Sequence, residues 1–190
     1  MSRTAERPVV LVVDDDETVA DTYAMQLGEA YETRVVYGGE AALSAIDASV
    51  DAVLLDRRMP GLSGDEVLER LRAAGYDCPV IMTTAVDPDL NILEMDFDDY
   101  LCKPILRETL LETLDQHLEA RGDSERLDEF FGLVSKLSVL EEEKTQAELA
   151  DSEEYERLHR RAEELGQELR DSVEEFDELV ATYREIDRGT

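Results

Sequence analysis

The sequence is poor in the residues that build zinc sites and redox motifs. Its 190 residues include two cysteines, Cys78 and Cys102, and two histidines, His117 and His159. The cysteines form no C-x-x-C pair, and two separate histidines complete no metal site. Zinc and dithiol chemistry are therefore excluded, and both cysteines are expected to be buried, reduced thiols.

The sequence also lacks a long apolar segment. The N-terminal residues MSRTAERP have no signal-peptide pattern, and the apolar run that follows, VVLVV, has five residues. A bilayer-spanning helix needs about 20. We therefore expect no membrane association and a cytoplasmic location.

Basic residues are scarce. The chain has 19 Lys and Arg against 48 Asp and Glu, a net charge of −29, and only three of the basic residues are lysines. Such a surface repels nucleic acid and anionic membranes, because phosphate binding requires clustered positive charge. Self-repulsion also destabilises a compact fold in dilute buffer, but in 1 M salt the Debye length falls to about 3 Å. The composition therefore indicates a halophilic protein.

The first two thirds of the chain alternate between short apolar runs and amphipathic stretches. The runs are VVLVVD (9–14), TRVVY (33–37), DAVLLD (51–56), PVIMTT (79–84) and DYLCKP (99–104). Helical patterns lie between and after them, at 17–29, 39–48, 64–74, 88–95 and 106–120. Nearly continuous apolar runs are typical of strands buried on both faces. The pattern predicts an α/β fold with a doubly wound parallel sheet over residues 8–121, with its ligand site beyond the carboxyl ends of the strands.

Residues 123–190 have a different character, with no proline and no strand pattern. Ten positions from Tyr155 to Ile186 follow 3-4 spacing, and nine of them are apolar, as in a coiled-coil seam. A shorter stripe precedes them between Leu127 and Leu137. A break near Asp151, a candidate N-cap, predicts a second domain that folds as an α-helical hairpin or coiled-coil tail. One continuous helix is the alternative.

Carboxylates follow the first and third predicted strands. Asp14, Asp15 and Asp16 come directly after the first, and adjacent carboxylates repel one another unless a cation or proton relieves them. Asp16 is also a candidate helix cap. Asp56 ends the third strand, where it could be both a ligand of Mg²⁺ and a nucleophile that forms an aspartyl phosphate.

Two further polar residues end the fourth and fifth predicted strands. Thr84 is followed by the small Ala85, which leaves room for a phosphoryl group. Lys103 could pair with Asp56 and then with a phosphoryl oxygen. Pro104 follows it directly, so the Lys103–Pro104 bond is a candidate cis peptide.

Residues 8–121 resemble the receiver domain of two-component response regulators. The motifs VVLVVDDD, VLLDRRMPGLSG, VIMTTA and DDYLCKP match that domain in order and spacing. The resemblance implies a flavodoxin/CheY-like sheet with strand order 2-1-3-4-5 and phosphorylation of Asp56 by a sensor histidine kinase. It also implies Mg²⁺ bound by Asp14, Asp15, Asp56 and the backbone carbonyl of Arg58.

The same resemblance assigns roles around the phosphoryl group. Thr84 and Lys103 would hold its oxygens, and Tyr100 would be the aromatic switch that turns inward with Thr84. The chain departs from the family just before this tyrosine, where Asp96 and Phe97 replace the common Gly-Ala.

Residues 123–190 are similar to the haloarchaeal HalX output domain, through LDEFFGLVSKLSVLEEEK and ELADSEEYERL. These residues carry 22 acidic and nine basic side chains and no nucleophile–base set. We therefore expect no enzyme activity beyond the chain's own phosphorylation and dephosphorylation. The output is expected to be contact with a protein partner or a second copy. A transcriptional regulator that binds DNA through the C-terminal helices is the alternative, because high salt weakens the charge repulsion.

The shorter upstream stripe can cover only part of the 155–186 seam. The residues expected to remain for contact with a partner are Phe176, Leu179, Tyr183 and Ile186. An exposed apolar stripe of that length favours association.

Overall fold

The computed structural model describes residues 7–85, 95–145, 148–149 and 151–187. The chain contains two compact units, Met1–Glu119 and Ala120–Thr190. Within the described part of the chain, no helix combines the length and the apolar character that crossing a membrane requires.

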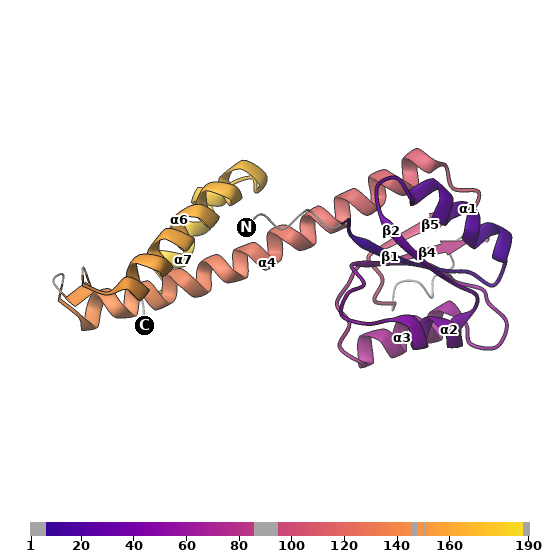
Figure 1. Cartoon of the computed structure of the whole chain (residues 1–190), viewed down its shortest axis with the longest axis horizontal. Helices are drawn as coiled ribbons and strands as arrows, with labels where there is room; N and C mark the ends of the chain where they lie inside the picture. Colours follow the sequence, from indigo (N-terminus) through magenta and orange to yellow (C-terminus); the bar gives the residue numbers. More distant parts are fainter. Residues whose placement is uncertain (1–6, 86–94, 146–147, 150, 188–190) are drawn as a thin grey trace. The chain divides into compact units, whose positions relative to one another are not determined.

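The first unit is built on a five-stranded parallel sheet (Figure 1). Its strands are β1 (Val9–Val13), β2 (Glu32–Val36), β3 (Ala52–Asp56), β4 (Val80–Thr84) and β5 (Asp99–Cys102). Their order is β2-β1-β3-β4-β5, with every neighbouring pair parallel. This confirms the predicted doubly wound α/β class.

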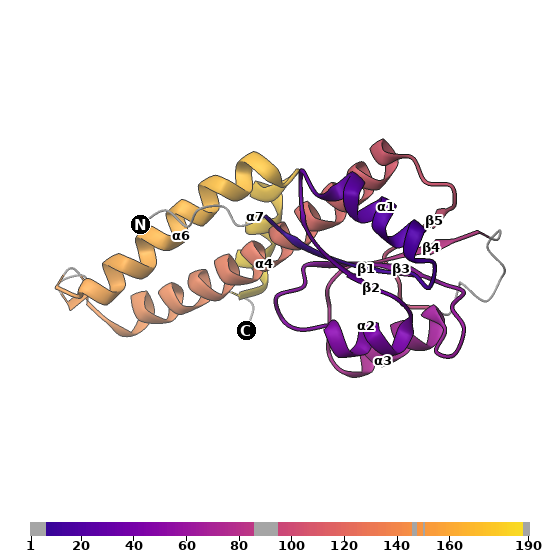
Figure 2. The ribbon, with the colours of Figure 1, turned by 45° about the vertical axis from the view of Figure 1, so that its right-hand side comes forward.

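Helices cover both faces of the sheet, with α2 and α3 on one side and α1 on the other (Figure 2). The bounds are α1 (Glu17–Leu27), α2 (Gly39–Ala45), α3 (Gly64–Ala73) and α4 (Arg107–Glu143). Asp16 caps α1 by accepting hydrogen bonds from the backbone of Thr18 and Val19. Ser63 and Glu66 form a capping box at α3.

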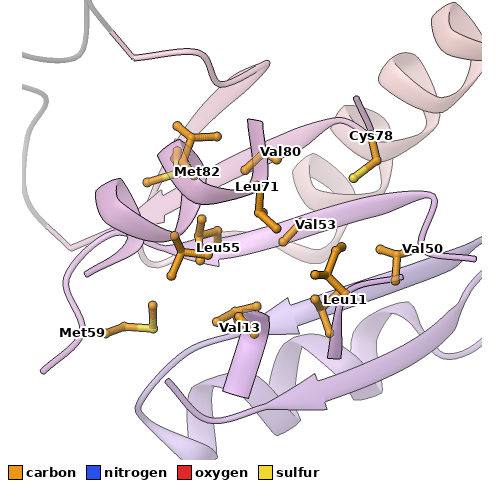
Figure 3. Packing of buried hydrophobic residues seen from close by; sticks show 14 of the residues in the cluster. Leu11, Val13, Val50, Val53, Leu55, Met59, Leu71, Cys78, Val80 and Met82 are labelled. Carbon is orange, nitrogen blue, oxygen red and sulfur yellow. The ribbon is translucent and has the colours of Figure 1, made fainter. Parts of the chain in front are cut away.

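Two apolar clusters explain why the strand sequences lack polar alternation. Odd-numbered residues of β1 and β3 pack toward α2 and α3, as Figure 3 shows for Leu11, Val13, Val53 and Leu55. The even-numbered residues pack on the opposite face, against α1 and the start of α4. Both faces of the central strands are therefore buried, as expected for a parallel sheet.

Some expectations for this unit are corrected. Cys78 is buried, but Cys102 is exposed at the end of β5. The helix predicted over 106–120 continues as α4 to Glu143. Most of the pattern at 88–95 lies outside the described residues.

The second unit is helical and contains α6 (Glu153–Ser172) and α7 (Phe176–Asp187) beside the C-terminal part of α4. Arg161 contacts Glu129, and Tyr155 contacts Glu141, so α6 runs antiparallel to α4. The hairpin prediction therefore describes this pair, and the continuous-helix alternative is wrong. Ser152, not Asp151, caps α6, because its hydroxyl accepts the backbone N–H of Tyr155.

The 155–186 seam is not one helix. It breaks after α6, where Glu175 has a φ of 60°, and α7 then packs against α4 again. Phe176 is only 2% exposed, and its ring lies 5.2 Å from that of Phe130. Its prediction as an uncovered contact residue is therefore wrong, because the reversal of the chain buries it.

The other three predicted contact residues differ among themselves. Tyr183 is partly buried, with its ring 4.4 Å from that of Phe131. Leu179 is 44% exposed, so among the described side chains of this set it alone has the exposure that the prediction requires. The side chain of Ile186 lies outside what the structure describes.

Candidate functional site

Polar residues from three strands meet at the carboxyl edge of the sheet. Asp14 follows β1, Asp56 ends β3, and Lys103 follows β5. Parallel strands end at the same edge, so residues far apart in sequence become neighbours there. Asp14 is 2% exposed and Asp56 5%, which is unusual for carboxylates.

Lys103 joins the two buried carboxylates. Its Nζ donates to Asp14 Oδ2 at 2.5 Å and to Asp56 Oδ1 at 2.6 Å. The remaining oxygens accept backbone N–H groups, Asp14 Oδ1 from Asp16 and Asp56 Oδ2 from Arg58, both at 3.0 Å. One ammonium faces two carboxylates, so further positive charge beside them would reduce the repulsion between the carboxylates.

Burial and neighbouring charges have opposite effects on the pKa values of Asp56 and Lys103. Burial raises the pKa of Asp56, and although Lys103 opposes this, the pKa remains above the usual value for an aspartate. Burial alone would lower the pKa of Lys103, but its bonds to Asp14 and Asp56 outweigh that effect and raise it. Lys103 is therefore held as a cation between the two carboxyls.

The cluster also fits a divalent cation. Carboxylate oxygens of Asp14, Asp15 and Asp56 all lie within 4.8 Å of one another, and Asp15 is the exposed member of the three. Oxygen donors of this kind suit Mg²⁺, which binds one or two carboxylates and keeps several waters. The backbone N–H of Arg58 donates to Asp56 Oδ2. Binding of Mg²⁺ by its backbone carbonyl stays a prediction.

Thr84 lies beside this group at the end of β4. It is 1% exposed, and its backbone carbonyl accepts the N–H of Lys103 at 2.7 Å. Ala85 follows it and is exposed. The Lys103–Pro104 peptide bond is cis. The structure thus brings Thr84 next to the lysine, while the phosphoryl contacts of both remain predictions.

Tyr100 lies in β5, partly buried against the apolar cluster under α2 and α3. Its ring centroid is 5.6 Å from that of Phe97, and its hydroxyl accepts a hydrogen bond from Arg57 at 3.3 Å. Arg57 has no role that the sequence predicts. It belongs to no recognisable spacing pattern, and in a chain with 16 arginines a single arginine is expected to be a surface charge. Its burial, at 7% exposed, is visible only in the fold.

Comparison with known families agrees with this geometry. Residues 10–115 match the response regulator receiver domain, and residues 120–187 match the HalX domain.

Individual relatives point the same way. A Haloferax volcanii protein described as "Putative transcriptional regulator" is 43% identical over an alignment of 195 positions, which covers 98% of this chain and 33% of that protein. The sensory transduction protein RegX3 of Mycobacterium tuberculosis is 41% identical over 121 residues, 61% of this chain and 53% of that protein. The chain thus spans between a third and about half of the length of these relatives.

Solved structures share the fold of the first unit. A CheY-like receiver domain protein from Methanospirillum hungatei has a TM-score of 0.59 and 26% identity, over 63% of this chain and 99% of that one. The BeF3-activated receiver domain of DrrB has a TM-score of 0.56 and 28% identity, over 60% of this chain and 98% of that one. Sequence motifs, strand order, site geometry and family matches agree, and the chain belongs to the response regulators of two-component systems, with a receiver domain followed by a HalX domain.

Proposed function

We propose that Asp56 accepts a phosphoryl group from the phosphohistidine of a sensor kinase, with Mg²⁺ bound at the acidic cluster, and that this step controls the HalX domain. The observation that carries the proposal is the position of Lys103, whose Nζ bonds both Asp14 and Asp56. A fixed cation beside a nucleophilic carboxylate stabilises the charge that gathers on a transferring phosphoryl group.

The transfer is a displacement at phosphorus. A carboxylate oxygen of Asp56 attacks, a P–O bond forms, and the P–N bond to the donor imidazole breaks. The electron pair stays on the imidazole, which takes a proton from solvent. Bound Mg²⁺ would supply positive charge for the phosphoryl oxygens. Lys103 can then exchange its bond to Asp56 for one to a phosphoryl oxygen, and the Thr84 hydroxyl can donate to another.

Dephosphorylation follows the same geometry with water as the nucleophile. Water attacks phosphorus, inorganic phosphate leaves, and Asp56 is restored as a carboxylate. These two reactions at its own side chain are the only catalysis that we propose for the chain.

Labelling with a small phosphodonor tests the proposal. Acetyl phosphate with Mg²⁺ should add one acid-labile phosphoryl group, measured by intact mass. Asp56→Asn keeps the shape and removes the nucleophile, so labelling should disappear, while the exposed control Asp47→Asn should label normally. Asp15→Ala should raise the Mg²⁺ concentration needed for labelling. Full labelling of Asp56→Asn would contradict the assignment.

For the output we propose contact of the HalX domain with a protein partner or a second copy. Val139 and Leu179 of this unit are 58% and 44% exposed, and residues 123–190 carry 22 acidic against nine basic side chains. Sedimentation of the full chain in molar KCl, with and without acetyl phosphate, should show a phosphorylation-dependent change in mass for self-association. An unchanged mass would leave a partner protein as the proposed contact.

The alternative output is binding of DNA, favoured by the description of the Haloferax volcanii relative as a transcriptional regulator. A gel-shift assay in molar KCl distinguishes the two outputs. Retarded DNA that depends on residues 120–187 would replace the protein-contact proposal.

A further inference from the structure

Arg57 connects α3 to β5 through a buried guanidinium. Its Nε donates to Asp65 Oδ1 at 3.0 Å and to Oδ2 at 3.3 Å, and its Nη2 donates to Oδ2 at 3.3 Å. Its Nη1 donates to Tyr100 Oη at 3.3 Å. Asp65 lies in the first turn of α3 and Tyr100 in β5, so one side chain holds two elements that are 35 residues apart in sequence.

These two attachments, to residues that the structure describes, differ in strength. Asp65 forms a salt bridge with the guanidinium and accepts three contacts in a fork geometry, which is the stronger kind of arginine bond. Tyr100 offers one neutral oxygen at 3.3 Å, at the long end of hydrogen-bond distances. If the guanidinium shifts, the Tyr100 bond is the one that breaks first. The tyrosine end of this link is therefore releasable, and the Asp65 end is fixed.

The backbone of Arg57 is coupled directly to the phosphoryl acceptor. Arg57 follows Asp56 in the chain, and its N–H donates to the carbonyl of Thr83 in β4 at 2.8 Å. The next N–H, of Arg58, donates to Asp56 Oδ2 at 3.0 Å. A phosphoryl group on Asp56 replaces the single negative charge of the carboxylate with up to about two and brings three acceptor oxygens to this point. The peptide between Arg57 and Arg58 must then adjust to a new acceptor.

We propose that Arg57 is a positioning residue that holds the Tyr100 hydroxyl while Asp56 is unphosphorylated and releases it when the phosphoryl group arrives. Asp65 keeps the guanidinium in both states, and Tyr100 becomes free to change its position beside Phe97. This inference rests on the proposed phosphorylation of Asp56, and it adds a link that carries the state of that residue to β5.

The resting state can be tested without any phosphodonor. The seven tyrosines of the full chain are labelled as 3-fluorotyrosine and observed by ¹⁹F NMR. The Tyr100 signal is the one that Tyr100→Phe removes. Arg57→Gln should move this signal in the unphosphorylated protein, and addition of Mg²⁺ and beryllofluoride to wild type should move it in the same direction. Tyr37, whose hydroxyl bonds Asp21, is the internal control and should not move.

The coupling to Asp56 is tested by titration with beryllofluoride, which mimics the phosphoryl group. Because the variants lose a bond made only in the resting state, half-saturation should need about three- to tenfold less beryllofluoride in Arg57→Gln and in Tyr100→Phe. In the Tyr100→Phe background, Arg57→Gln should not lower the half-saturating beryllofluoride concentration any further. The controls Tyr37→Phe and Arg34→Gln remove exposed bonds and should titrate like wild type.

Circular dichroism first confirms that each variant is folded. If Arg57→Gln is not, Arg57→Lys replaces it, because a lysine keeps the charge and loses the fork, and Tyr100→Phe removes a single oxygen. An unmoved Tyr100 signal, or an effect of the Arg57 change that persists in Tyr100→Phe, overturns the inference. Absence of labelling at Asp56 in wild type would instead overturn the proposed function, and the resting-state signal distinguishes the two failures.

Discussion

Gly64 is the position where one added methyl group should damage the phosphoryl-acceptor site most directly. It is the first residue of α3, and a Cβ built there would lie 2.2 Å from the backbone oxygen of Asp56 and 2.8 Å from Cα of Arg57. Ordinary contacts begin near 3.4 Å, so helix and strand must separate by at least about 1 Å. The strand cannot recede, because β3 is hydrogen-bonded between β1 and β4.

The size of the effect follows from three contributions. Overpacking of this kind costs about 1–3 kcal/mol. The separation also weakens the bond from the N–H of Gly64 to the carbonyl of Arg57, now 2.9 Å, at about 1 kcal/mol. Alanine recovers up to about 1 kcal/mol of helix propensity. Gly64→Ala should therefore lower the free energy of unfolding by about 1–3 kcal/mol.

Urea unfolding in molar KCl measures this loss as a lower midpoint at an unchanged slope. The labelling rate of Asp56 should fall at least about tenfold, because a displacement near 1 Å at a reacting group is costly. The matched control is Gly61→Ala in the loop before α3, where a Cβ meets nothing within 4 Å but φ is +77°. Gly61→Ala should lower the free energy of unfolding by about 1–2 kcal/mol through backbone strain alone, and its Asp56 should be labelled at the normal rate. Equal midpoints and equal labelling for the two variants would refute the reasoning.

Three further predictions concern the helical unit, the lifetime of the phosphoryl group and salt. Leu165→Ala, at a fully buried position of α6, should destabilise the helical unit by about 2–5 kcal/mol, whereas Leu179→Ala should destabilise it by less than about 1 kcal/mol. Thermal melts followed by circular dichroism compare the two variants, and equal losses of stability would contradict the packing of α6. Arg58→Asn should speed loss of the label from Asp56, because the exposed arginine there offers no acid or base to orient water; an unchanged decay rate would discard this explanation. The melting temperature should rise steadily from about 0.1 M to several molar KCl, since salt screens the net charge of −29, and a flat profile would show that the acidic surface is no halophilic adaptation.

The strands were predictable from the sequence to within about two residues because both of their faces are buried. A run such as VVLVV can satisfy two apolar clusters only in the centre of a parallel sheet. The site followed from the same pattern, since Asp14, Asp56 and Lys103 come where strands end and parallel strands end together. Local pattern and global fold agree in this part of the chain.

The remaining features depend on contacts between distant residues. The 3-4 spacing continues through 172–176, so periodicity alone cannot reveal the reversal at Glu175, which places Phe176 against Phe130. The end of α4 was also missed, because its helical pattern continues past residue 120 without a break signal. The contacts of Arg57 could not be predicted, because they depend on the fold bringing Asp65 and Tyr100 next to it.

The reversal at Glu175 also changes the kinetic order of folding. A straight 155–186 helix could bury only part of its apolar stripe against the shorter upstream stripe. The rest would be buried only by meeting another chain, in a second-order step whose midpoint depends on protein concentration. With α7 folded back, Phe176 and Leu169 find their partners within the same chain. The HalX helices can therefore complete their core in a first-order reaction and be ordered before any partner arrives.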